Sequence, residues 1–127
     1  MEYATLIVLL ALLQYVWFTV RVGSTREKYN VKAPACEGDV TWERSFRVHQ
    51  NTMEQLIMLI PATYAFAYYT SSVWVLLPGA AFILGRFLYS AEYMKDPKTR
   101  APGMIMTFAA NATLILGALF GLIKGML

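Results

Sequence analysis

Residues 41–69 read TWERSFRVHQNTMEQLIMLIPATYAFAYY, and this stretch decides the fold. Its apolar part, residues 56–69, covers only about 21 Å at a rise of about 1.5 Å per residue, whereas the hydrocarbon core of a bilayer is roughly 30 Å thick. A helix that spans a bilayer here must therefore begin near Thr41 and carry charged side chains with it. Pro61 lies inside this helix and should kink it, which is tolerated where neighbouring helices cover the freed carbonyl.

Three further apolar stretches predict helices over about residues 2–22, 74–94 and 103–123, each near the roughly 20 residues that a bilayer requires. Hydrophobic residues make up 57% of the chain and charged residues only 15%, against about 25% charged in an average soluble domain. The sequence therefore predicts an all-α integral membrane fold, in which four transmembrane helices form an up-down bundle. At this length we expect one domain over residues 1–127.

The residues present also argue against several classes of protein and of site. Residues 3–20 resemble a secretory signal in being apolar, but Glu2 precedes them and bulky Trp17 and Phe18 lie near their end, so we expect a retained helix. The net charge of +3 is too small to suggest nucleic acid as a partner. Cys36 and His49 are the only residues of their types, so we expect no metal site.

The distribution of lysine and arginine predicts the orientation in the membrane. Basic residues flank the first and third connections, whereas the second connection has none and the C-terminal end has only Lys124. Because basic loops stay on the cytoplasmic side, we expect connections one and three in the cytoplasm and both termini in the periplasm or lumen. The membrane would be a bacterial inner membrane or one of the endoplasmic-reticulum type.

Polar side chains recur at helical spacing on the second and third predicted helices. The second carries Arg44, Arg47, Asn51 and Glu54, and the third carries Arg86, Tyr89 and Tyr93, with Arg100 seven residues later. A charge at membrane depth costs at least about 2.5 kcal/mol, so these residues should face the bundle interior and pair with each other or with a ligand. The alternative for each is a place at headgroup level, as a snorkelling or paired interface residue.

Two separate motifs resemble the signatures of the MAPEG family, the membrane-associated proteins of eicosanoid and glutathione metabolism. One is Glu43-Arg44-x-x-Arg47-x-His49-x-Asn51-x-x-Glu54; the other is Gly85-Arg86-x-x-Tyr89-x-x-x-Tyr93, followed by Arg100-Ala101-Pro102. The resemblance extends to length, helix pattern and orientation. Within the family, the chain looks most like the microsomal glutathione transferases of the bacterial and type-three branch.

The resemblance implies a homotrimer with glutathione as co-substrate, bound between adjacent subunits near the cytoplasmic face. Arg47 and Arg86 would bind its carboxylates and Glu54 its ammonium group. The family pattern gives contacts with the peptide to Asn51, Tyr89 and Tyr93, and contacts with a neighbouring subunit's ligand to His49 and Arg26.

The resemblance also gives the catalytic role to Arg100. A free thiol has a pKa near 8.5, and a neighbouring cation lowers that pKa and raises the fraction of thiolate. The family's leukotriene-forming synthases place an arginine seven residues after the second tyrosine, which is the spacing from Tyr93 to Arg100. The alternative is that Arg100 only anchors the start of the last helix on the cytoplasmic side.

One departure from the family pattern limits the substrate assignment. Gln55 stands where the leukotriene synthases have a tyrosine, so we expect a general glutathione S-transferase or peroxidase that acts on apolar electrophiles or lipid hydroperoxides from the bilayer. Asn111 is either an interhelical hydrogen-bonding residue or part of the lipid-facing pocket. Two other functions remain as alternatives: a non-catalytic lipid-binding scaffold of the same fold, and a small four-helix transporter, which would need an acidic residue in its first helix.

Overall fold

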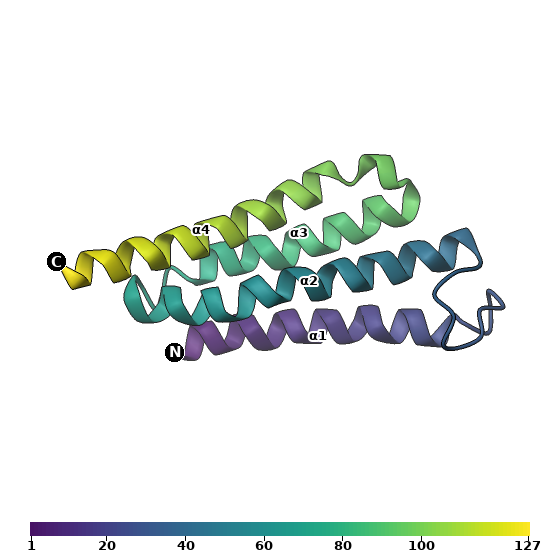
Figure 1. Cartoon of the computed structure of the whole chain (residues 1–127), viewed down its shortest axis with the longest axis horizontal. Helices are drawn as coiled ribbons and strands as arrows, with labels where there is room; N and C mark the ends of the chain where they lie inside the picture. Colours follow the sequence, from purple (N-terminus) through teal and green to yellow (C-terminus); the bar gives the residue numbers. More distant parts are fainter.

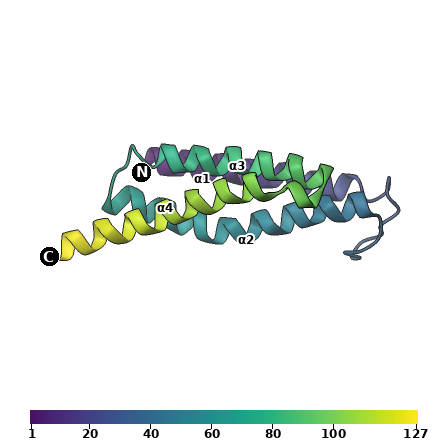
Figure 2. The same ribbon diagram turned by 90° about the horizontal axis from the view of Figure 1, so that it is seen from above.

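The computed structural model describes all residues 1–127 as an all-helical chain without strands, so the all-α prediction is confirmed. Long helices alternate in direction, and both termini lie at the end of the bundle that also holds the α2–α3 connection (Figures 1 and 2). The elements are α1 (Glu2–Ser24), α2 (Val40–Tyr69), α3 (Leu76–Lys95), the short 3₁₀ turn η1 (Pro97–Thr99) and α4 (Ala101–Met126).

The first two helices extend one or two residues beyond the approximate bounds expected from the sequence. The first helix continues to Ser24 instead of residue 22. The second begins at Val40 instead of Thr41, because the carboxylate of Asp39 caps it: Asp39 Oδ1 accepts from the backbone N–H groups of Thr41 (2.8 Å) and Trp42 (3.1 Å). Helix α2 is continuous from Val40 to Tyr69, with Pro61 inside it and the charged side chains of residues 43–54 in its first half.

The last two helices differ by up to three residues from the approximate bounds expected from the sequence. Helix α3 begins at Leu76 instead of residue 74, because the hydroxyl of Ser71 accepts from the backbone N–H groups of Val73 and Trp74 and holds both in a turn. Helix α4 is longer than predicted at both ends. Pro102 belongs to its first turn, where a missing N–H costs nothing.

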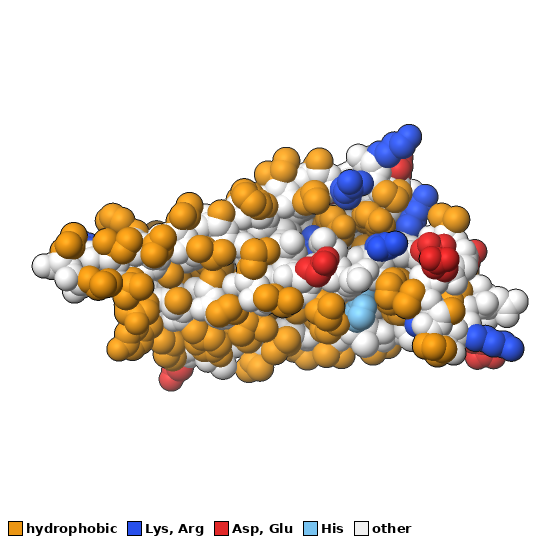
Figure 3. Space-filling model, viewed as in Figure 1, with side chains coloured by type: hydrophobic (Ala, Val, Ile, Leu, Met, Phe, Trp, Pro, Cys, Tyr) orange, Lys and Arg blue, Asp and Glu red, His pale blue; other side chains and the backbone are white.

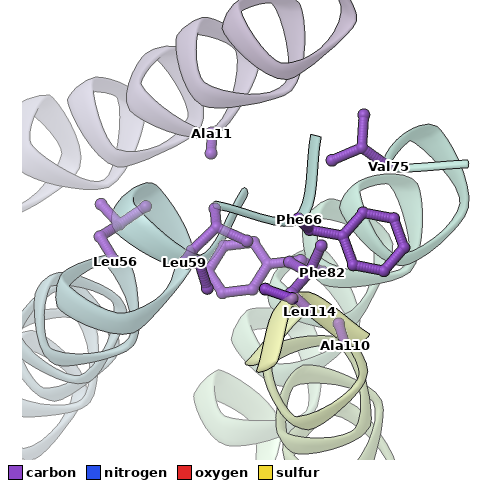
Figure 4. Packing of buried hydrophobic residues seen from close by; sticks show 10 residues of the cluster. Ala11, Leu56, Leu59, Phe66, Val75, Phe82, Ala110 and Leu114 are labelled. Atoms are coloured by element: carbon purple, nitrogen blue, oxygen red, sulfur yellow. The ribbon is translucent and has the colours of Figure 1, made fainter. Parts of the chain in front are cut away.

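The core is built from apolar side chains of all four helices (Figure 4). Ala11 of α1, Leu59 of α2, Phe82 of α3 and Leu114 of α4 are fully buried there. Gly117 brings α4 close to α2, since a Cβ at this position would lie 2.4 Å from the ring of Phe66. These contacts hold the four helices together in the half of the bundle that is remote from the charged connections.

On the face shown in Figure 3, apolar side chains cover most of the length of the bundle, and charged side chains gather at the end that holds the α1–α2 and α3–α4 connections. Leu13, Ile57 and Phe108 are between 65% and 73% exposed. Exposed apolar area of this extent is typical of contact with lipid or with another protein chain. By length and composition, α1 and α4 are each apolar enough to cross a membrane.

Candidate functional site

A buried arginine lies near the middle of α3. Arg86 is fully buried, and its Nη1 donates to Asn51 Oδ1 at 2.6 Å and to Thr52 Oγ1 at 3.4 Å, both on α2. Its guanidinium carbon lies 4.2 Å from the centre of the Tyr89 ring. The remaining guanidinium atoms, Nε and Nη2, are buried without a hydrogen-bond partner. This chain therefore provides hydrogen-bond partners for only one of the three guanidinium nitrogens, although burying an unpaired cation is costly.

Two stacked tyrosines continue from Arg86 towards the charged end of the bundle. The rings of Tyr89 and Tyr93 lie 5.5 Å apart with an angle of 25° between their planes. Tyr89 is buried and Tyr93 is half-buried, so the stack leads from the interior to the surface. The face predicted from the spacing of Arg86, Tyr89 and Tyr93 thus exists as a column on α3.

The polar residues of α2 serve different purposes, although they share one helical face. Asn51 contacts Arg86, whereas Arg44 donates to the carbonyls of Met94 (3.1 Å) and Lys95 (3.2 Å) at the end of α3. Such terminal carbonyls have no partner within their own helix, so Arg44 acts as a cap. Arg47 is exposed and lines a shallow hollow of about 220 Å³ together with Tyr93, and Glu54 is exposed one turn beyond Asn51.

Arg100 is the residue that precedes α4, and it is exposed. Its Nη1 donates to the carbonyl of Pro97 at 2.9 Å, which holds the side chain over η1. The carboxylate of Glu92 accepts from the backbone N–H of Gly103 at 3.3 Å and so ties the first turn of α4 to α3. The roles of Glu92 and Gly103 were not predicted from the sequence. The signals that point to them are an acidic residue at the end of one helix and a glycine in the first turn of the next.

His49 and Arg26 lie away from this column, against α1 and the first connection. The His49 ring stacks on Tyr15 of α1, with 4.8 Å between ring centres. Arg26 donates to the carbonyl of Ala35 at 2.8 Å, and its guanidinium lies 4.6 Å from the ring of buried Trp42. Within one chain, these two residues therefore do not join Arg86 and Tyr93.

A cavity of about 400 Å³ lies against the buried arginine. Polar residues on its wall are Asn51, Gln55, Arg86, Thr107 and Asn111; the remaining lining is made mainly of apolar side chains of α2 and α4: Met58, Met104, Phe108, Ala112, Ile115 and Leu116. An apolar groove of about 410 Å³ between α2 and α4 shares Met58 and Ile115 with it. The polar wall suits the charged end of one ligand, and the apolar wall suits a second, apolar ligand beside it. Across residues 1–127, no group of three or more His, Cys, Asp or Glu residues is placed to hold a metal ion.

Comparison with known proteins gives a consistent result. The family model of the MAPEG proteins matches residues 4–120. The chain is 35% identical over 118 residues to an uncharacterized protein of Synechocystis, which covers 93% of this chain and 86% of that protein. It is 34% identical over 112 residues to microsomal glutathione S-transferase 2 of Homo sapiens, covering 87% of this chain and 76% of the human protein.

A shorter match joins the chain to a probable microsomal glutathione S-transferase of Dictyostelium discoideum. The two are 41% identical over 73 residues, which is 58% of this chain and 49% of that protein. The family match covers nearly the whole bundle, including the Arg86 column and the start of α4. This chain belongs to the MAPEG family of membrane-associated proteins.

Proposed function

We propose that this protein is a membrane glutathione transferase that binds glutathione along the Arg86–Tyr93 column and uses it as a thiolate. One observation carries the proposal: Arg86 is a fully buried cation with Nε and Nη2 unpaired beside a cavity of about 400 Å³. A carboxylate is the group that best completes a guanidinium, because it accepts two parallel N–H bonds. Relatives named as microsomal glutathione S-transferases supply the candidate ligand, and glutathione carries two carboxylates.

The other side chains around the column match the remaining groups of glutathione. In this proposal Arg47, which lines a hollow with Tyr93, binds the second carboxylate, and the exposed Glu54 binds the ammonium group. Asn51 uses its Oδ1 for Arg86, which leaves its amide nitrogen to donate to the peptide of the ligand. The hydroxyls of Tyr89 and Tyr93 are further donors.

The proposed catalytic residue is Arg100. Its position before the first turn of α4 puts a guanidinium and the positive end of a helix dipole at the same place. Both favour an anion, so a glutathione sulfur bound there ionises at lower pH than in water. The thiolate then attacks an apolar electrophile, or a lipid hydroperoxide, that enters from the bilayer along the apolar wall of the cavity.

We further propose a homotrimer of single-domain chains over residues 1–127, each with four transmembrane helices, in which the charged connections face the cytoplasm and the termini face outward. His49 and Arg26 contact α1 and the first connection of their own chain and not the Arg86–Tyr93 column, which supports a role for them at the ligand of a neighbouring subunit. The extensive apolar surface supports contact with lipid and with other subunits. A non-catalytic lipid-binding scaffold is the alternative function.

Glutathione titration of the detergent-purified protein tests this proposal, with the thiolate followed by ultraviolet absorbance and binding followed by equilibrium dialysis. We expect a thiolate signal in the parent, its loss in Arg100→Ala with binding retained, and no change in Lys98→Ala, which removes a nearby exposed charge. Binding without thiolate in the parent would favour the scaffold. Absence of binding would refute the glutathione assignment.

A further inference from the structure

A pair of amide side chains lies in the cavity wall beyond Arg86. Asn111 of α4 is 2% exposed, and its Nδ2 donates to Gln55 of α2, to Oε1 at 3.0 Å and to the backbone carbonyl at 3.4 Å. Both residues line the cavity of about 400 Å³. Gln55 follows Asn51 by one helical turn, and Asn51 holds Arg86. Gln55 therefore lies one turn beyond Asn51, and both amides share the cavity with Arg86.

These contacts determine which amide atoms remain available. A backbone carbonyl only accepts, so Asn111 must turn its nitrogen towards Gln55 and its Oδ1 away from it. That Oδ1 is buried and has no hydrogen-bond partner. Gln55 Oε1 accepts from Asn111, which leaves both N–H groups of Gln55 Nε2 to donate elsewhere. Two neighbouring residues of the cavity wall thus keep one buried acceptor, Asn111 Oδ1, and one donor, Gln55 Nε2.

The surroundings of the pair are apolar. Met58, Phe108 and Ile115 line the same cavity. A buried acceptor without a partner is unfavourable, and an apolar wall supplies no donor to it. A ligand that enters among these side chains and carries an O–H group satisfies Asn111 Oδ1, whereas a ligand with acceptors alone leaves it unpaired.

We propose that Gln55 and Asn111 determine specificity for the second substrate, favouring a group that both donates and accepts a hydrogen bond, such as a hydroperoxide, over electrophiles that only accept, such as enones. This inference rests on the proposed glutathione function. The hydroperoxide O–H donates to Asn111 Oδ1, and Gln55 Nε2 donates to the inner oxygen. The apolar chain of the substrate lies along Met58 and Phe108.

The same contacts assist the reaction of such a substrate. The glutathione thiolate attacks the outer oxygen, so an S–O bond forms while the O–O bond breaks. The inner oxygen leaves with the electron pair, hydrogen-bonded by Gln55, and takes a proton to give the alcohol. The hydroperoxide is reduced and the sulfur is oxidised to a sulfenic acid, which a second glutathione converts to glutathione disulfide and water.

The test compares two substrates of equal chain length, a fatty-acid hydroperoxide and an enone, at saturating glutathione. We expect Asn111→Leu to lower kcat/KM for the hydroperoxide about tenfold, the worth of one hydrogen bond, and to change that for the enone less than about twofold. Thr113→Val is the control, because Thr113 is exposed on the same helix and should leave both values unchanged. Equal losses on both substrates would overturn the proposal and leave the pair as a tie between α2 and α4.

Two further measurements keep the test decisive if Asn111→Leu does not fold. Gln55→Met should also lower the ratio of hydroperoxide to enone turnover. The parent protein should accelerate reduction of a hydroperoxide much more than that of its methyl-capped peroxide, which has no O–H; equal acceleration would refute the inference. A parent that binds glutathione but reduces no hydroperoxide refutes this inference alone, whereas a parent that binds no glutathione refutes the proposed function as well.

Discussion

Gly103 in the first turn of α4 lies directly against the backbone of Tyr89 in α3. A Cβ at Gly103 would lie 2.4 Å from the Tyr89 nitrogen and 2.6 Å from its Cα, which are distances that real side chains do not occupy. The absence of a side chain thus lets α4, which Arg100 precedes, begin next to the tyrosine column.

Gly103→Ala should therefore damage both stability and activity. The backbone of α4 must move away from Tyr89, which we expect to cost about 1–3 kcal/mol and to shift Arg100. Thermal unfolding in detergent and the thiolate signal with glutathione measure the two effects. Gly125→Ala is the matched control, since a Cβ there meets nothing within 4 Å. A Gly103→Ala protein with parental stability and thiolate signal would contradict the close approach.

Replacing Arg86 should separate stability from binding. Arg86→Met removes a buried charge with two unpaired nitrogen atoms, so we expect unchanged or higher thermal stability without glutathione. The same variant should bind glutathione at least about tenfold more weakly, because it loses a charge-assisted pair of bonds to a carboxylate. Arg86→Lys keeps the charge without the planar fork and should be intermediate in affinity. Unchanged affinity in Arg86→Met would remove this residue from the proposed site.

The pH dependence of turnover should report on Arg100. A thiol whose pKa is lowered on the protein is ionised, and reactive, from that lower pKa upward, whereas a free thiol ionises near pH 8.5. We expect kcat/KM of the parent to rise with pH and to level off below about pH 8.5. In Arg100→Ala the midpoint should move to higher pH, and Arg100→Lys should restore part of the shift. Coincident profiles for the parent and Arg100→Ala would assign thiol activation to another group.

We expect Trp42 to stabilise the folded conformation of the connection between α1 and α2. It is fully buried, its indole N–H donates to the carbonyl of Val22 at 3.0 Å, and Arg26 covers its ring. Trp42→Ala should cost about 3–5 kcal/mol in thermal unfolding and expose the first connection to protease. Trp42→Phe keeps the ring but loses the hydrogen bond, so its loss should be smaller. Equal losses in the two variants would mean that packing contributes little.

The sequence predicts α1, α3 and α4 from their long apolar runs and α2 from the length that its short apolar run lacks, and the ends of all four lie within three residues of expectation. The errors come from caps such as Asp39 and Ser71, whose effect on a boundary depends on local side-chain geometry. Spacing places Arg86, Tyr89 and Tyr93 on one face, since all three belong to one helix.

The spacing of residues along the sequence could not predict which side chains of different helices contact each other. Arg44 shares a face with Asn51, yet it caps the end of α3, because its distance along α2 puts it at the level of Lys95. The bond between Glu92 and Gly103 and that between Asn111 and Gln55 likewise depend on how far one helix slides along another. A single sequence contains no direct measure of that offset.

The pairing of Arg86 with Asn51 and Thr52 has a consequence for biogenesis. If α3 entered the bilayer alone, an arginine near its centre would oppose insertion by about 2.5–3.5 kcal/mol. Helix α2 leaves the ribosome before α3 and is joined to it by the short connection of residues 70–75, so its amide and hydroxyl are already present when Arg86 emerges. With the four-span topology proposed above, we expect the translocon to release α2 and α3 into the lipid as one hairpin, so Asn51→Leu should reduce membrane integration of α3.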